Sequence, residues 1–185
     1  MQHPDANRRN ETHAPQGRAA QPQRTGIYTP EERKRRDASP WTIVQGVLAP
    51  LQFLVFLVSL GLVLRFLATG EGLLAATVSV VVKTLVLYTI MVTGAIWEKK
   101  VFGVYLFAPP FFWEDVFSML VIALHTAYLA AALTGALPAH QQMYLALAAY
   151  ATYVVNAGQF LLKLRGARLE QSRMATVSGD LALTK

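Results

Sequence analysis

The sequence of 185 residues contains no cysteine, which excludes disulfide bonds, thiolate metal sites and a cysteine nucleophile. It also lacks a glycine-rich phosphate loop, an HExxH motif, a nucleophile-elbow serine and any regular repeat. Acidic residues are few, since 11 Asp and Glu stand against 17 Lys and Arg. What remains for chemistry is proton transfer by carboxylates and histidine in mostly apolar surroundings.

Long apolar runs take up most of the chain. Each of four runs reaches or exceeds the roughly 20 residues that a helix needs to cross the hydrocarbon core of a membrane, and the mean hydropathy of the chain is +0.34. The runs are Trp41–Leu67, Leu73–Ile96, Pro110–Leu133 and Gln141–Leu164. We therefore predict an all-α integral membrane protein in which residues 39–168 form four antiparallel transmembrane helices.

The two ends of the chain are polar. Residues 1–38 are rich in Pro, Gln, Arg and Ala, so they bury too little apolar surface to offset chain entropy, and we predict a disordered cytoplasmic tail. Residues 169–185 are predicted to be a flexible cytoplasmic tail. Lys and Arg collect before the first run, after the second and after the fourth, which places both termini in the cytoplasm. This topology accounts for the net charge of +6 without nucleic-acid binding.

Three acidic residues are expected to gather at the cytoplasmic ends of the second and third helices. Glu98 lies near the end of one predicted helix, and Glu114 and Asp115 lie near the start of the next. The aromatic residues Trp97 and Trp113 are adjacent to these acids in the sequence. Acids in a first helical turn complement the helix dipole, but Glu98 lies at a helix C-terminus, where a carboxylate is disfavoured. Capping thus explains only part of the cluster, and we predict that at least one of the acids is catalytic.

Further polar side chains lie within the apolar runs. Lys83 and His125 fall near the middle of two neighbouring helices, and antiparallel packing brings them to a similar depth. Lys83 then meets either a carboxylate or a polar interior, and His125 is either functional or bonded across the bundle. The fourth helix carries a polar stripe, which is functional or serves interhelical hydrogen bonding. The stripe consists of Thr152, Asn156, Gln159 and Lys163.

The residues alone leave several functions open. Proton transfer on a hydrophobic substrate, haem or pigment binding, and proton-coupled transport all fit carboxylates and a histidine inside a membrane bundle. A family resemblance distinguishes among them. Six strings resemble the 3-vinyl bacteriochlorophyllide hydratase family of phototrophic bacteria, over about Tyr28 to Arg168. They are Tyr28–Arg33 (YTPEER), Asp37–Thr42 (DASPWT), Val81–Met91 (VVKTLVLYTIM), Ile96–Lys99 (IWEK), Phe112–Leu120 (FWEDVFSML) and Asn156–Phe160 (NAGQF).

The resemblance implies addition of water to the 3-vinyl group of chlorophyllide a or a related bacteriochlorophyllide, giving a 1-hydroxyethyl group in bacteriochlorophyll biosynthesis. It also implies a location in the bacterial inner or photosynthetic membrane. No cofactor is expected, because magnesium enters as part of the substrate. Association into a homo-oligomer or with other pigment-biosynthesis enzymes stays open. A non-enzymatic tetrapyrrole carrier or assembly factor is the main alternative, followed by a proton-coupled transporter.

Roles for individual residues follow from the implied reaction. We expect the pigment to lie between helices with its vinyl edge toward the acids, Glu98 to donate the proton, and Glu114 and Asp115 to activate water or stabilise the cation. His125 is expected to be an axial ligand to the substrate magnesium, a catalytic base or a structural residue. The expected substrate-binding residues are His125, Lys83, Trp97, Trp113, Asn156 and Gln159.

Overall fold

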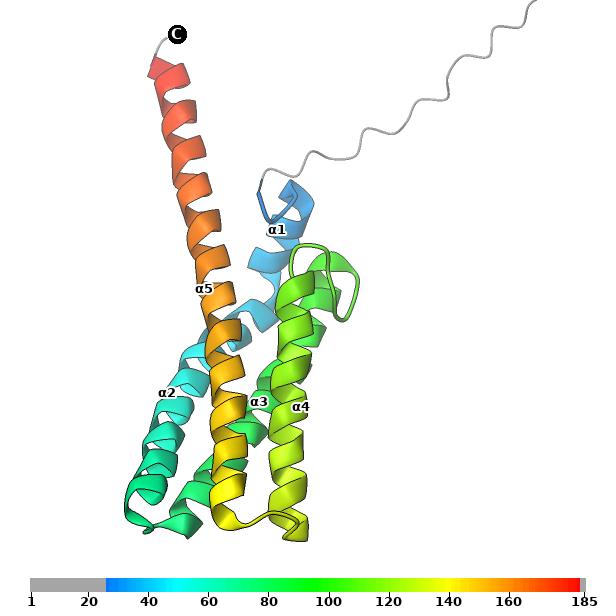
Figure 1. Cartoon of the computed structure of the whole chain (residues 1–185). Helices are drawn as coiled ribbons and strands as arrows, with labels where there is room; N and C mark the ends of the chain where they lie inside the picture. Colours follow the sequence, from blue (N-terminus) through cyan, green and yellow to red (C-terminus); the bar gives the residue numbers. More distant parts are fainter. Residues whose placement is uncertain (1–25, 184–185) are drawn as a thin grey trace, which may run out of the picture.

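The computed structural model describes residues 26–183, which form five helices and, within that range, no strand. The helices are α1 (Pro30–Ala38), α2 (Pro40–Thr69), α3 (Leu73–Phe102), α4 (Phe112–Thr134) and α5 (Ala139–Leu183). Figure 1 shows α2 to α5 as an elongated antiparallel bundle, with α1 at one end and α5 extending beyond that end. We refer to this end as the α1 end. The all-α prediction is confirmed.

Four helices are long and apolar enough to span a membrane, judged by length and composition within the described residues. They are Pro40–Thr69, Leu73–Phe102, Phe112–Thr134 and Ala139–Leu169, of which no more than 28% of the most apolar stretch is buried inside the protein. Large apolar side chains such as Leu74, Leu133 and Leu162 are exposed on the outside of the bundle. An outer surface of this kind is stable in lipid but not in water, so the chain is an integral membrane protein.

Glycines end the spans where the sequence turns back. Gly70 has φ +73° and donates its N–H to Phe66 O at 2.8 Å, while Gly103 has φ +86° and donates to Lys99 O at 3.2 Å. This left-handed C-cap satisfies a free carbonyl of the last turn and suits glycine, which has no Cβ to clash. α2 and α4 end within a turn of the predicted limits, whereas α3 continues to Phe102, six residues beyond Ile96.

Residues 30–38 differ from the expected tail because they form α1. The helix begins at a capping box in which Thr29 Oγ1 accepts from Glu32 N at 3.2 Å and Glu32 Oε2 accepts from Thr29 N at 2.8 Å. The ring of Tyr28 stacks on that of Phe102 at 5.8 Å, and burial raises the pKa of the Tyr28 phenol. Local capping and these aromatic contacts stabilise a segment whose composition alone indicates disorder.

At the other end of the chain, α5 continues to Leu183, so most of the predicted C-terminal tail is helical. Residues 1–25 of the expected N-terminal tail lie outside the described residues. The interior of the bundle is packed with aliphatic and aromatic side chains, of which Val63, Val80, Val121 and Tyr128 are fully buried. Against this apolar interior, buried ionisable side chains stand out as candidates for function.

Candidate active site

The three acids expected to form a cluster are all buried at the α1 end. Glu98 lies in the last turns of α3, and Glu114 and Asp115 lie in the first turn of α4. Their exposed fractions are 5%, 7% and 4%, although the connection between α3 and α4 carries exposed residues. Carboxylates are rarely buried to this extent without partners, and the partners differ among the three acids.

Glu98 and Asp115 form a pair. Their carboxyl groups lie close enough to interact directly, and a hydrogen bond between two carboxyl groups requires one proton between them. The connection between α3 and α4 supplies a backbone donor to each group. Phe107 N donates to Asp115 Oδ2 at 2.7 Å, and Ala108 N donates to Glu98 Oε2 at 3.2 Å. Two consecutive amides therefore hold acids from two different helices side by side.

The backbone at Phe107 has an unusual conformation. Its φ is +60°, and within the described part of the chain no other residue except glycine has a positive φ. For a side chain with a Cβ this conformation costs roughly 1–2 kcal/mol. Such outliers persist where surrounding contacts fix the backbone, and they concentrate at functional sites. Here the residue with this conformation also supplies the backbone N–H that donates to Asp115.

Glu114 belongs to a separate ion pair. Lys163 of α5 lies 2.6 Å from Glu114 Oε2 and also donates to the carbonyl of Pro110. The same Nζ is 4.9 Å from the centre of the Phe111 ring. The cluster thus consists of a carboxyl pair and a neutralised carboxylate. Sequence reasoning placed Lys163 on the polar stripe of the fourth helix but did not identify Glu114 as its partner.

Other stripe residues lie one and two turns from Lys163. Asn156 Nδ2 donates to Ser118 Oγ at 2.8 Å, which joins α5 to α4 one turn beyond Glu114. Asn156 Oδ1 and Gln159 Oε1 are buried and make no hydrogen bond to the described residues. Buried acceptors without donors are uncommon in folded proteins. They are suited to a hydroxyl or a water molecule between α4 and α5.

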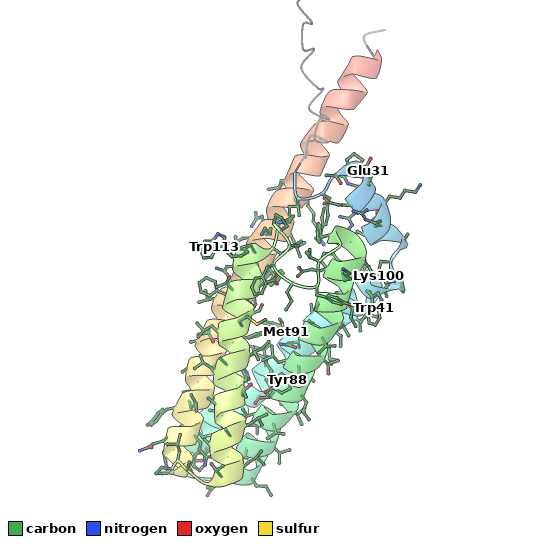
Figure 2. All side chains as sticks on the ribbon, turned by 90° about the vertical axis from the view of Figure 1, so that its right-hand side faces the viewer. Glu31, Trp41, Tyr88, Met91, Lys100 and Trp113 are labelled. Atoms are coloured by element: carbon green, nitrogen blue, oxygen red, sulfur yellow. The ribbon has the colours of Figure 1, made fainter. Side chains whose placement is uncertain are left out.

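The two expected tryptophans have different surroundings. Trp97 Nε1 donates to Thr42 Oγ1 at 3.0 Å, and its ring lies 5.7 Å from that of Phe111, in the aromatic cluster beside the acids. Trp113 is 67% exposed, and Figure 2 shows it projecting outward near the α1 end. The structure therefore packs Trp97 in an aromatic cluster with Phe111, the residue before α4, whereas Trp113 lies outside that cluster.

Lys83 and His125 form a second polar cluster near the middle of the bundle, and both are fully buried. Lys83 Nζ lies 3.8 Å from the centre of the Tyr153 ring. With the Gln52 amide oriented to suit its neighbours, Gln52 Oε1 accepts from Lys83 Nζ at 3.1 Å and its nitrogen donates to Val86 O at 3.2 Å. No acid is paired with Lys83 among the described residues. Its amine instead contacts the Gln52 amide and the Tyr153 ring.

His125 makes one local bond. Its Nδ1 lies 2.8 Å from Val121 O, one turn earlier on α4, and its ring is 5.8 Å from that of Tyr150. Its Nε2 has no partner within the described residues and is the nitrogen available to a metal in a pigment. His125 lies ten residues beyond Asp115 on α4, about 15 Å along the helix axis. The two polar clusters are therefore separate.

The bond between Gln52 and Lys83 can be tested by stability measurements. We expect Gln52→Leu to lower the free energy of unfolding by about 1–3 kcal/mol, because it leaves the buried amine without its amide acceptor. Gln52→Leu combined with Lys83→Met removes both polar groups and is expected to recover most of this loss. Unfolding of the detergent-solubilised protein gives both values. A double variant less stable than Gln52→Leu would contradict the proposed pairing.

Four apolar spanning helices with a buried carboxyl pair at one end define an integral membrane protein equipped for acid–base chemistry. Comparison with known proteins makes this class specific. The chain belongs to the 2-vinyl bacteriochlorophyllide hydratase (BCHF) family, whose sequence pattern matches residues 28–166. The resemblance found in the sequence is thereby confirmed. The chain is a hydro-lyase, a hydratase of bacteriochlorophyll biosynthesis.

Two relatives support this assignment, and both carry the name 2-vinyl bacteriochlorophyllide hydratase. The protein from Rhodobacter capsulatus is 72% identical over 149 residues, which cover 80% of this chain and 86% of the relative. The protein from Cereibacter sphaeroides is 73% identical over 144 residues, which cover 78% of this chain and 89% of the relative. No solved structure matches the chain.

Proposed function

We propose that this chain adds water to the vinyl group of chlorophyllide a or a related bacteriochlorophyllide, and that Glu98 and Asp115 transfer the protons. The observation that carries the proposal is the pair of buried carboxyl groups, which accept hydrogen bonds from two consecutive backbone amides. The relatives' names number the vinyl group 2, in place of the 3 used in the sequence analysis. Hydration of an alkene needs an acid and a base on one site, and this pair supplies both.

The reaction proceeds in one proton transfer to the substrate and one from the attacking water, and a third transfer restores the pair. Glu98 protonates the terminal vinyl carbon, the π electrons form the new C–H bond, and the adjacent carbon becomes a cation delocalised over the macrocycle. Water adds to that carbon and gives a proton to Asp115, which leaves a 1-hydroxyethyl group. The proton then returns from Asp115 to Glu98 through their hydrogen bond, and the pair is restored. Two carboxyl groups with divided acid and base roles are a recurring arrangement in enzymes.

Glu114 takes no part in proton transfer in this proposal, because the Lys163 ammonium at 2.6 Å already neutralises it. The site then has one mobile proton, which the Glu98 and Asp115 pair shares. Asn156 and Gln159 are the best candidates for polar contacts to the substrate or the water, because each has a buried acceptor oxygen without a donor among the described residues. Trp97 packs against Phe111, the residue that precedes α4.

His125 and Lys83 are assigned a structural role. The rise of about 15 Å along α4 between Asp115 and His125 exceeds the distance from the centre of a chlorin ring to its vinyl group. We assign the magnesium no bond to His125, whose ring is held by Val121 O and packs on Tyr150. Lys83 lies on α3 fifteen residues before Glu98, about 22 Å along the axis, and is remote from the reacting group.

The orientation that fits this site places the α1 end in the cytoplasm, where water and a pigment carboxylate are available. Lys99 and Lys100 follow Glu98 at this end, as the enrichment of basic residues on the cytoplasmic side requires. Both termini are then cytoplasmic, and the membrane is the inner or photosynthetic membrane of the bacterium. Reaction of an added cysteine at Lys100 with a membrane-impermeant reagent, in intact and in opened cells, tests the orientation.

Product mass tests the function directly. Membranes that contain the chain are incubated with chlorophyllide a, and the extracted pigment is weighed by mass spectrometry. We expect a product heavier than the substrate by one water, with loss of the vinyl proton signals. Membranes that lack the chain are the control. Pigment that is retained by the protein with unchanged mass would indicate a carrier instead of a hydratase.

A further inference from the structure

We propose that Lys163 is a positioning residue, which fixes the α3–α4 connection so that its amides hold Glu98 and Asp115 together. Lys163 would touch neither the substrate nor the reacting atoms. The proposal rests on the proposed function, because it assigns Lys163 a role toward the carboxyl pair that transfers the protons. It concerns a residue of α5, the helix that follows both catalytic acids in the sequence.

Three contacts attach Lys163 to the elements around the carboxyl pair. Its Nζ bonds Glu114 in the first turn of α4, donates to the carbonyl of Pro110 in the connection, and lies against the Phe111 ring between them. The Lys163 side chain is 25% exposed and that of Glu114 is 10% exposed. An ion pair in partial burial is screened less than a surface pair and holds its geometry better.

Backbone bonds carry this attachment to the catalytic acids. Phe111 N donates to Ala108 O at 2.7 Å, which closes the turn that contains Pro110. Ala108 N and Phe107 N then donate to Glu98 and Asp115. Lys163 contacts this turn at Pro110. That position is two residues after Ala108, whose N–H donates to Glu98. Movement of the turn would alter both carboxyl positions.

Helix packing alone does not set the spacing of the acids. The strongest packing in the bundle is within the α2–α3 and α4–α5 hairpins, whereas α3 and α4 contact each other sparsely. Glu98 belongs to the first hairpin, while Asp115 and Lys163 belong to the second. The α3–α4 connection therefore links the hairpins at the catalytic pair, and Lys163 bonds this connection from α5.

Kinetics of Lys163 variants test the role. We expect Lys163→Met to lower kcat by on the order of 10²-fold, because a displacement of about 1 Å at a catalytic group has that effect, while KM changes little. Lys163→Arg keeps a cation and N–H donors and is expected to restore most of kcat. Arg165→Met is the matched control, since it removes an exposed cation from the same turn of α5, and it should behave as the wild type.

A distance measurement separates positioning from other effects. The chain has no cysteine, so spin labels at Lys100→Cys on α3 and Val116→Cys on α4 report one distance between the hairpins. Both positions are exposed. We expect a narrow distribution in the otherwise unaltered chain and in Lys163→Arg, and a broadened or shifted one in Lys163→Met. If Lys163→Met does not accumulate in membranes, Lys163→Gln replaces it in both experiments with the same expectation.

An unchanged distance distribution in the charge-removing variant would overturn the proposal, whether or not its activity falls. Equal loss of kcat in Arg165→Met would overturn it as well, because the effect would then follow the general charge of α5. The distance result does not depend on the reaction. If Glu98 and Asp115 proved dispensable for hydration, the proposed function would fail while the spin labels still decided whether Lys163 holds the connection.

Discussion

Glu98→Gln and Asp115→Asn are each expected to lower kcat for hydration by about 10²–10⁴-fold, the range that a positioned acid or base contributes. The amides keep the size of the carboxyl groups and can still accept from Ala108 N and Phe107 N. Each substitution removes a carboxyl group that either donates or accepts the transferred proton. The measurement is the initial rate of formation of the hydrated pigment in membranes with matched amounts of each variant.

Two comparisons make this result specific to proton transfer. Glu114→Gln is expected to lower kcat less than either substitution, because Lys163 retains its bond to the Pro110 carbonyl. The variant carrying both Glu98→Gln and Asp115→Asn is expected to be little worse than the single variants, since groups that act as a unit show non-additive losses. Full activity in both single variants would exclude the carboxyl pair as the proton-transfer site.

The spans were predictable because a membrane imposes a simple requirement on length and hydropathy. Trp41–Leu67 was expected where the structure has Pro40–Thr69, and a hydrocarbon core leaves a sequence little freedom within such limits. The meeting of Glu98 with Asp115 was also accessible, because a short connection between antiparallel helices brings those ends together. These inferences needed only positions along the chain.

The division of the acids into two sets was not predictable from those positions. It depends on the rotation of α5, which directs Lys163 at Glu114 across 49 residues of sequence. Rotation also separates Trp97, turned into the aromatic cluster, from the exposed Trp113. Apolar residues surround membrane helices on all sides, so hydropathy gives little information on which face turns inward. Contacts across the bundle decide it.

The backbone geometry of the α3–α4 connection was also not predictable from the sequence. A positive φ is expected at glycine, as at Gly103, but Phe107 adopts one with a large side chain. The signal that indicates a compact turn is the Pro109-Pro110 pair that follows, because proline restricts the residue before it. It does not indicate that two amides of the turn face carboxylates. That arrangement exists only when α3 and α4 are both in place.

Phe107→Pro is expected to be among the most damaging single substitutions at the α1 end. Proline fixes φ near −65°, whereas Phe107 has φ +60°. It also removes the N–H that Asp115 accepts at 2.7 Å, and a hydrogen bond to a charged group contributes roughly 1.5–3 kcal/mol. We expect the turn to refold away from the acids, with loss of hydration and a lower unfolding temperature of the solubilised protein.

Phe107→Gly is the matched control, because glycine accepts a positive φ and retains the N–H. Relief of a left-handed conformation stabilises by roughly 1–2 kcal/mol, which offsets the loss of the half-exposed ring and the greater chain entropy of glycine. We therefore expect stability close to that of the wild type and substantial hydration activity. Equal activity in the glycine and proline variants would show that the Phe107 amide does not position Asp115. If only the proline variant loses activity, the reaction depends on the backbone N–H of residue 107 and not on the side chain at this position.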